Sequence, residues 1–414
     1  MKRAEVFTPN TLPSVTYVGE HLIEKKKLLD QNLEMGGAVI AISGPSKSGK
    51  TVFIETAGGY DTLILVSGAN VTHPDDLWRR VFTAIGTPIP ATNMSNMTIS
   101  GAATGGIEGG VPMVAKATGS LTLKADAASG QSSDVRPDFL ALLIRELKDT
   151  SFVVFVDDFH YIAKSVQVEV ASLIKEAVRQ GLRFVVASVS YHSDDVLIAN
   201  NDLRGRLLKL DFDYWDTEEL SKIAEKGFAA LNVEVSKATI QSFAMESAGS
   251  PQLMQSLCLN LCFEEDIYET GNESRVIQPN VQTIDKICRR AAQTNDYSSV
   301  IRVMKDGPKV RGTERNSYVL KDGKASDVYP ILMKAISLSP PELTLSYPSL
   351  LTRIASVCVN DHPQGSSVTG ACMHMSALAN DVAGAPIVEW DAEKDVLDIR
   401  DPYLLFALRW SELT

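Results

Sequence analysis

The sequence lacks long apolar runs, paired cysteines and an excess of positive charge. No apolar run in the 414 residues approaches the length of roughly 18 residues that a membrane-spanning helix needs, so we expect no membrane span. The five cysteines are an odd number and are scattered, which argues against a disulfide framework and a zinc site. The net charge of −11 excludes non-specific coating of nucleic acid or anionic membrane, although it allows a local basic patch.

The composition is that of a folded protein. Apolar residues make up 44% and charged residues 22% of the chain, so disorder throughout is excluded. The length predicts two or three domains. Residues 1–9 contain no apolar signal core, and we therefore expect a cytoplasmic protein.

A phosphate-binding loop is the strongest motif. Residues 44–51 fit the pattern G-x-x-x-x-G-K-T, after a buried-strand pattern at 38–43 and before a helix-compatible segment at 52–57, which is the context of a P-loop. Lys50 would reach the β- and γ-phosphates, and Thr51 would offer its hydroxyl to Mg²⁺. The residues assigned to nucleotide binding here are Gly44, Pro45, Ser46, Lys47, Ser48, Gly49, Lys50, Thr51 and Val52.

Two carboxylates follow a second apolar strand pattern, at residues 152–156. Asp157 is placed to order the magnesium shell together with Thr51, in the manner of a Walker B residue. Asp158 is placed to act as the general base toward the attacking water. Because Asp is shorter than the Glu that is more usual at this position, we expect slow turnover.

The first half of the chain predicts an α/β fold. Strand patterns alternate with helical patterns, which indicates a parallel sheet whose ligands bind at the carboxyl ends of the strands. The further strand patterns are residues 62–67, 183–190 and 207–212. Residues 91–134 break the alternation with small residues. They predict either an inserted β-hairpin that contacts a partner or ligand, or a mobile surface insertion.

The second half predicts a helical lid, a basic connector and a winged helix. Residues 301–324 carry seven basic and three acidic residues, and they form either a solvated linker face or an arm that contacts phosphate or another subunit. Residues 328–414 predict three helices, a β-hairpin and a final helix. Their five basic and ten acidic residues favour contact with protein over DNA.

The ordered motifs resemble the AAA+/STAND group of ATPases, and within it the branch of origin-recognition initiators and STAND signalling ATPases. The resemblance covers most of residues 15–290. It implies an ASCE P-loop parallel sheet, a helical lid and a C-terminal winged helix. It also implies ATP or ADP with Mg²⁺ as cofactors, and hydrolysis of ATP to ADP and phosphate.

The resemblance implies further site residues before and after the sheet. Tyr17 and Val18 lie in a segment similar to the box beside the adenine, although Glu20 stands where that box has Arg. Pro251 completes a motif similar to the G-x-P of STAND lids. Gln252 and Gln255 follow it without the sensor Arg usual in AAA+ lids, which implies tight nucleotide holding and slow hydrolysis.

Two further site assignments are each shared between two residues that are close in the sequence. Arg204 and Arg206 resemble the arginine-finger position, which acts on the nucleotide of a neighbouring subunit, and the alternative is a pair of surface arginines. Ser188 or Ser190 resembles the polar sensor 1 residue.

These patterns predict an ATP-binding, slowly hydrolysing switch. Its nucleotide state would control homo-oligomerisation and the activation of a separate effector or sensor protein, in bacterial phage defence or signalling. The alternative is a DNA-handling AAA+ protein, such as an initiator, a loader or a transposition regulator, that grips DNA through residues 301–324. The expected parts are an N-terminal arm (1–35), an ATPase core (36–215), a lid (216–300), a connector (301–327) and a winged helix (328–414).

Overall fold

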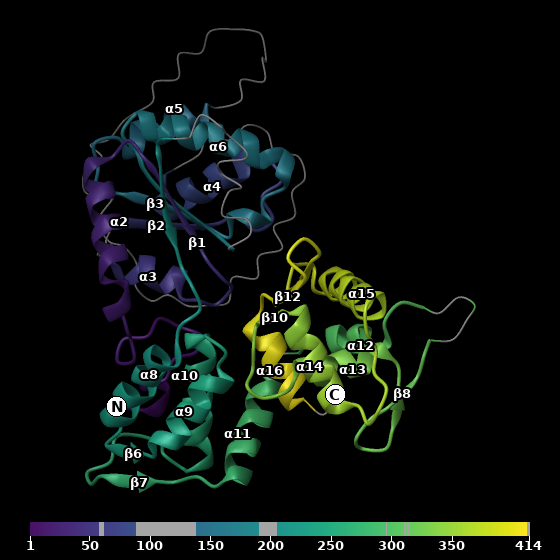
Figure 1. The fold of residues 1–414 in the computed structure, drawn as a ribbon. Coiled ribbons are helices and arrows are strands. Elements are labelled where there is room, and N and C mark those ends of the chain that lie inside the picture. Colours follow the sequence, from purple (N-terminus) through teal and green to yellow (C-terminus); the bar gives the residue numbers. More distant parts are fainter. Residues whose placement is uncertain are drawn as a thin grey trace, which may run out of the picture. The chain divides into compact units, whose positions relative to one another are not determined.

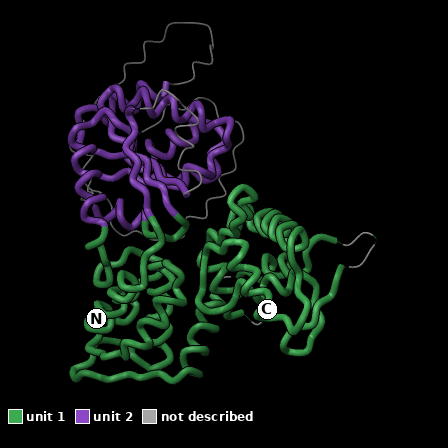
Figure 2. The backbone as a smooth tube through the Cα atoms, viewed as in Figure 1, with its two compact units in different colours: residues 1–21, 45–49, 213–414 green, residues 22–44, 50–212 purple. Residues whose placement is uncertain are grey.

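The chain forms two compact units, which Figure 2 colours separately. In the computed structural model, the sheet unit comprises residues 22–44 and 50–212, and the lid–winged-helix unit comprises residues 1–21, 45–49 and 213–414. The structure describes residues 1–57, 62–87, 138–189, 205–294, 296–309, 312 and 315–411. The insertion expected at residues 91–134 therefore lies outside the described residues.

The sheet unit is built on five parallel strands in the order β2-β3-β4-β1-β5. Figure 1 labels β1, β2 and β3 among them. The strands are β1 (Val39–Ser43), β2 (Leu63–Ser67), β3 (Val153–Asp157), β4 (Arg183–Ser188) and β5 (Leu207–Asp211). The helices are α2 (Ile23–Met35), α3 (Lys50–Ala57), α4 (Pro74–Ile85), α5 (Phe139–Leu147) and α6 (Lys164–Arg179). This is the α/β arrangement that the alternating strand and helix patterns predict.

The strands are apolar on both faces because helices cover both faces. Along β3, Val154 and Val156 pack into the cluster formed with α4, α5 and α6, whereas Phe155 packs into the cluster formed with α2 and α3. Side chains alternate between the two faces of a strand, so a strand buried on both sides reads as a continuous apolar run.

The lid consists of four helices, a two-stranded parallel sheet and the N-terminal segment. Its elements are α8 (Thr217–Ala230), β6 (Val233–Val235), α9 (Lys237–Glu246), α10 (Pro251–Glu264), β7 (Arg275–Ile277) and α11 (Val281–Gln293), with α1 (Arg3–Val6). Val6, Phe7 and Val18 lie in the lid core. A Cβ placed on Gly227 would lie 2.2 Å from Cε1 of Phe7, so only glycine leaves room there for that ring. The N-terminal residues are thus an integral part of the lid.

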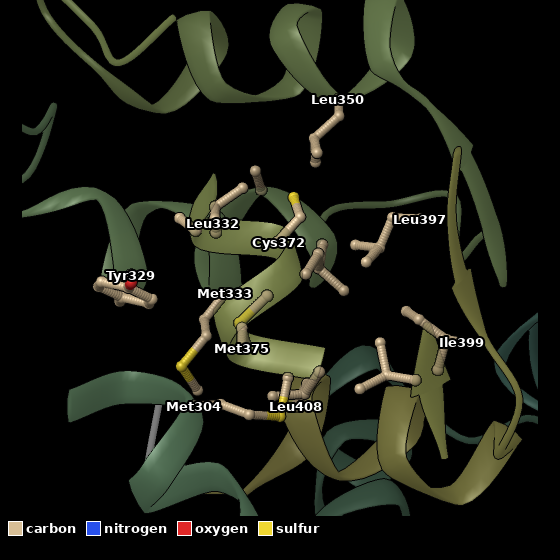
Figure 3. Packing of buried hydrophobic residues seen from close by; sticks show 14 of the residues in the cluster. Met304, Tyr329, Leu332, Met333, Leu350, Cys372, Met375, Leu397, Ile399 and Leu408 are labelled. Carbon is tan, nitrogen blue, oxygen red and sulfur yellow. The ribbon is translucent and has the colours of Figure 1, made fainter. Parts of the chain in front are cut away.

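The winged helix surrounds a core of its own, part of which Figure 3 shows. Its elements are α13 (Val328–Ile336), β10 (Thr344–Ser346), α14 (Tyr347–Val357), α15 (Ser366–Ala383), β11 (Val388–Asp391), β12 (Val396–Ile399) and α16 (Pro402–Trp410). The strands pair antiparallel in the order β10-β12-β11. The expected helices, hairpin and final helix are therefore present.

The expected connector contains parts of that same core. Helix α12 (Ser298–Asp306) extends into the expected connector. The strands β8 (Tyr318–Val319) and β9 (Ala325–Ser326) form an antiparallel hairpin in the expected connector. Ile301, Met304 and Leu320 are buried in the winged-helix core. The boundaries of the five expected parts remain a prediction.

Helix α16 joins the lid to the winged helix. Leu404 and Leu408 pack into the winged-helix core, whereas Tyr403 and Phe406 pack into the lid core. At its end, Arg409 forms an almost completely buried ion pair with Glu246 of α9, at 2.6 Å. An α-helix that is apolar all round is one that is buried all round. Among the described residues, no helix combines the length and the apolar character needed to cross a membrane.

Candidate functional site

Polar residues gather at the carboxyl edge of the five-stranded sheet. The register aligns Ser43 with Ser188 and with Asp211, and it aligns Ser67 with Asp157. Ser43 donates a hydrogen bond to Asp211 across β1 and β5. The edge is where a parallel α/β sheet binds its ligand.

Lys50 and Thr51, at the start of α3, face the end of β3. The Thr51 hydroxyl donates to Oδ2 of Asp157 at 2.6 Å, and Lys50 Nζ donates to the backbone oxygen of Gly44 at 2.9 Å. A hydroxyl beside a carboxylate supplies the oxygen ligands that Mg²⁺ prefers, with phosphate oxygens and water completing an octahedron. The pair would therefore fit a magnesium ion that arrives with a nucleotide. In the described part of the chain, no group of three or more His, Cys, Asp or Glu is suited to hold a metal.

Burial changes the acid–base properties of Lys50. Desolvation lowers its pKa to about 8, against the opposing attraction of Asp157 and Asp158. Burial of an ammonium favours its neutral form. The phosphates of a nucleotide would add negative charge beside it and favour the protonated form.

Asp158 occupies a strained turn directly after β3. Its φ of 55° lies in the left-handed region, and its N–H donates to Oδ1 of Asp157 at 2.9 Å. A Cβ placed on Gly68 would lie 2.6 Å from the Asp158 backbone oxygen, so the loop after β2 packs closely on this turn. Desolvation first and the charge of Asp157 second raise the Asp158 pKa, as suits a group that accepts a proton.

The tip of the phosphate loop, residues 45–49, belongs to the lid–winged-helix unit. Trp215 Nε1 donates to the Ser48 backbone oxygen at 3.0 Å. A Cβ placed on Gly49 would lie 3.9 Å from both Pro251 Cγ and Trp215 Cζ2. The Ser48 hydroxyl is buried and has no hydrogen-bond partner within the described part of the chain, so it is available to a ligand. Lid residues thus hold the tip from one side.

Lys47 reaches the winged helix from the same tip. Its Nζ lies 3.2 Å from Oδ1 of Asp401 and 3.9 Å from the centre of the Tyr403 ring. Tyr297 donates its hydroxyl to Oδ2 of Asp401 at 2.5 Å. Asp401 is also the N-cap of α16, because its Oδ1 accepts the N–H of Tyr403 at 2.9 Å. The carboxylate is therefore fixed before it meets the ammonium.

The G-x-P motif has a clear geometric basis. Gly249 has a φ of 79°, and a Cβ there would lie 2.5 Å from Cβ of Tyr214. Ser250 caps α10 by accepting the N–H of Leu253, and Pro251 is the first residue of that helix. Only glycine suits the first position, and proline suits a first helical position. The motif therefore presents Pro251 to the loop tip.

The segment expected beside the adenine, which contains Tyr17 and Val18, lies on the lid. The backbone oxygen of Tyr17 accepts from Lys226 Nζ at 2.8 Å, and the same ammonium pairs with Glu20 at 2.8 Å. The hydrogen bond from Lys226 is the main cause that lowers the Glu20 pKa. Val18 is buried in the lid core. Its side chain is thereby committed to packing, whereas the neighbouring Tyr17 is partly exposed.

The remaining expected residues divide between described and masked positions. Ser188 is buried at the end of β4, and Arg206 is exposed before β5, where its backbone oxygen accepts the Val39 N–H. Ser190 and Arg204 lie outside the described residues. The finger and sensor assignments therefore remain predictions, as do the roles of Pro45, Ser46 and Val52.

Three side chains beside the loop tip were not expected from the sequence: Trp215, Asp401 and Tyr403. The aromatic pair Tyr214-Trp215, directly before the lid, was the one local signal for Trp215. Asp401 and Tyr403 lie about 350 residues from the P-loop, at a helix cap whose pattern indicates only a helix start.

Solved structures share this architecture. A Walker-type ATPase of Pyrococcus abyssi has a TM-score of 0.53 and 14% identity, over 93% of this chain and 95% of that chain. The ORC2 protein of Aeropyrum pernix, solved as ADPNP-ADP complexes, has a TM-score of 0.52 and 13% identity, over 98% of this chain and 96% of that chain. The chain has the fold of an ASCE P-loop ATPase. No family profile matches the sequence, and no curated protein is significantly similar to it.

Proposed function

We propose that this protein binds ATP and hydrolyses it slowly, as a switch of the AAA+/STAND type. The observation that carries the proposal is the grouping of Lys50, Thr51, Asp157 and Asp158 at the carboxyl edge of the sheet. Lysine, hydroxyl and two carboxylates at that place are the set that phosphoryl transfer from ATP to water needs.

Each side chain has a distinct role in this proposal. Lys50 binds the β- and γ-phosphates, and Thr51 and Asp157 hold Mg²⁺, which neutralises phosphate charge when bound. Asp158 accepts a proton from the water whose oxygen attacks the γ-phosphorus, and the bond from that phosphorus to the β–γ bridging oxygen breaks. The Asp158 side chain is shorter than the Glu that is more usual at this position, which supports a low rate.

The nucleotide state would control self-association and the activation of a partner protein. Arg206, exposed before β5, is the described candidate for a finger that acts on a neighbouring subunit. The family resemblance alone motivates a role in bacterial phage defence or signalling, with a separate effector or sensor chain. Cytoplasmic localisation belongs to the same proposal.

Solution mass and turnover test this function together. Light scattering after size exclusion should show a larger particle with a non-hydrolysable ATP analogue than with ADP, and Lys50→Ala should abolish the difference. Arg206→Ala should retain ATP binding and lose both assembly and turnover. Turnover by Arg206→Ala at wild-type rate across all protein concentrations would remove the finger assignment, and a monomer in every state would remove homo-oligomerisation.

DNA handling is a second candidate, favoured by exposed basic residues on and after α12. Arg302, Lys305 and Lys309 are exposed. Arg315, by contrast, pairs with Asp327 at 2.7 Å and stacks on Tyr329, so it serves the fold. Exchanging the three exposed residues for Glu should abolish a salt-dependent mobility shift at about 50 mM salt. Absence of any shift with the wild-type chain would exclude this candidate.

A further inference from the structure

The phosphate loop contains a second lysine, Lys47, whose backbone has an unfavourable conformation. Lys47 has a φ of 61°, in the left-handed region that glycine adopts freely and that is unfavourable for other residues. It lies three residues before Lys50, on the part of the chain whose backbone N–H groups surround phosphate in a P-loop. A long cationic side chain at such a position is placed to meet negative charge.

The negative charge that Lys47 meets here is Asp401. The ammonium contacts both carboxylate oxygens, at 3.2 and 3.4 Å, and lies over the Tyr403 ring. The Lys47 side chain is 26% exposed and that of Asp401 is 12% exposed, so the pair is less screened than a pair on an open surface. The winged helix thus holds the tip of the phosphate loop through the negative charge of Asp401. A nucleotide phosphate carries a charge of the same sign.

The carboxylate is built as a fixed anchor, and the lysine is the movable partner. Asp401 is held by the Tyr297 hydroxyl and by the N–H of Tyr403, whereas Lys47 has four rotatable side-chain bonds. The groups within this contact are therefore one ammonium, one carboxylate, two phenol rings and a helix N-terminus. One ammonium at this distance cannot be fully engaged by the carboxylate and by a phosphate at the same time.

We propose that Lys47 is a second phosphate-binding lysine, and that Asp401 and the phosphates of a nucleoside di- or triphosphate compete for it. Nucleotide binding withdraws Lys47 from Asp401 and releases the winged helix from the loop tip. This inference rests on the proposed nucleotide binding, and it adds a regulator of that same site. The winged helix opposes nucleotide binding through one carboxylate.

Four variants test the competition: Asp401→Asn, Lys47→Met, the double variant and Asp322→Asn. Asparagine retains the helix cap and the shape of Asp401 while removing its charge. Asp322, between β8 and β9, forms an ion pair with Lys334 of α13 at 2.6 Å, so its variant is a matched control. Dissociation constants for ADP and for a non-hydrolysable ATP analogue are measured by calorimetry at fixed salt, with thermal unfolding as the check of folding.

Asp401→Asn should tighten the binding of both nucleotides about threefold to tenfold, and Lys47→Met should weaken it by a similar factor. In the Lys47→Met background, Asp401→Asn should change nothing, and Asp322→Asn should bind as the wild type does. An unchanged affinity in Asp401→Asn, or an equal effect with and without Lys47, would overturn the competition.

The outcomes also separate this proposal from the proposed function. If the wild type binds nucleotide, Lys50→Ala does not, and Asp401→Asn equals the wild type, nucleotide binding stands and the competition is wrong. If the wild type binds neither nucleotide, both proposals are wrong.

Discussion

The two ends of the phosphate loop differ in how their partners are supplied. The Lys50 end faces Thr51, Asp157 and Asp158, which lie at the start of α3 and at the end of β3 in the sheet unit. The Lys47 end is held by Trp215 and Asp401, from the beginning of the lid and the end of the winged helix. In the proposed function the first end carries the chemistry, and in the proposed competition the second end restrains it. Variants at the two ends should therefore fail in different ways.

The largest effect is expected at the Lys50 end. Lys50→Ala should weaken the binding of ATP and ADP at least about 100-fold, because it removes the charge-assisted contacts to the phosphates. Fluorescence titration with a labelled nucleotide measures this loss. Lys334→Ala, which removes a half-buried lysine of α13 that pairs with Asp322, should bind normally. Tight binding by Lys50→Ala would show that the nucleotide lies elsewhere.

Asp158→Asn should separate binding from hydrolysis. The change keeps the side chain's size, and it should lower ATP turnover about 100-fold or more while leaving the ATP dissociation constant within about twofold. Phosphate release under saturating ATP measures the turnover. Hydrolysis at the wild-type rate would remove Asp158 from the role of base.

The pH dependence of binding should report on Lys50. In the nucleotide-free protein its pKa is about 8, and bound phosphate favours the protonated form. Binding must therefore take up a proton above pH 8, and affinity should fall about tenfold per pH unit as the pH rises from there. Calorimetry at pH 8.5 in buffers of different ionisation heats measures the uptake. Proton release, or an affinity that rises with pH, would contradict the assignment.

A smaller effect is expected at the Lys47 end. Trp215→Phe keeps the ring packing and removes the hydrogen bond to the Ser48 oxygen, so nucleotide affinity should fall about threefold. Trp410→Phe removes a bond to Glu246 in the same unit and should lower the melting temperature without changing that affinity. Equal affinities in the two variants would indicate that Trp215 has no part in positioning the loop.

Local patterns predicted the sheet unit and the Lys50 end. Buried parallel strands are continuous apolar runs, and the P-loop and Asp157-Asp158 directly follow two of them. A parallel sheet brings the carboxyl ends of its strands to one edge, whatever the order of the strands. Residues that directly follow the strand patterns could therefore be expected to lie close together. The observed order places β4 between β1 and β3, which strand patterns alone do not specify.

The Lys47 end could not be predicted because its contacts join distant segments. Nothing local distinguishes Asp401 from other helix caps such as Asp138 or Asp216. Helix α12 was missed for a related reason. Its buried Val300, Ile301 and Met304 are interspersed with exposed charges in a segment dominated by polar residues, so its average composition resembled a linker.

Hydrogen–deuterium exchange with and without nucleotide tests the central claim most directly, because it reports on both ends of the loop in one experiment. With ADP or a non-hydrolysable ATP analogue, we predict slower exchange in residues 44–51 and faster exchange at the start of α16, where Asp401 loses Lys47. Lys50→Ala should show neither change. Unaltered exchange in residues 44–51 at saturating nucleotide would contradict the account.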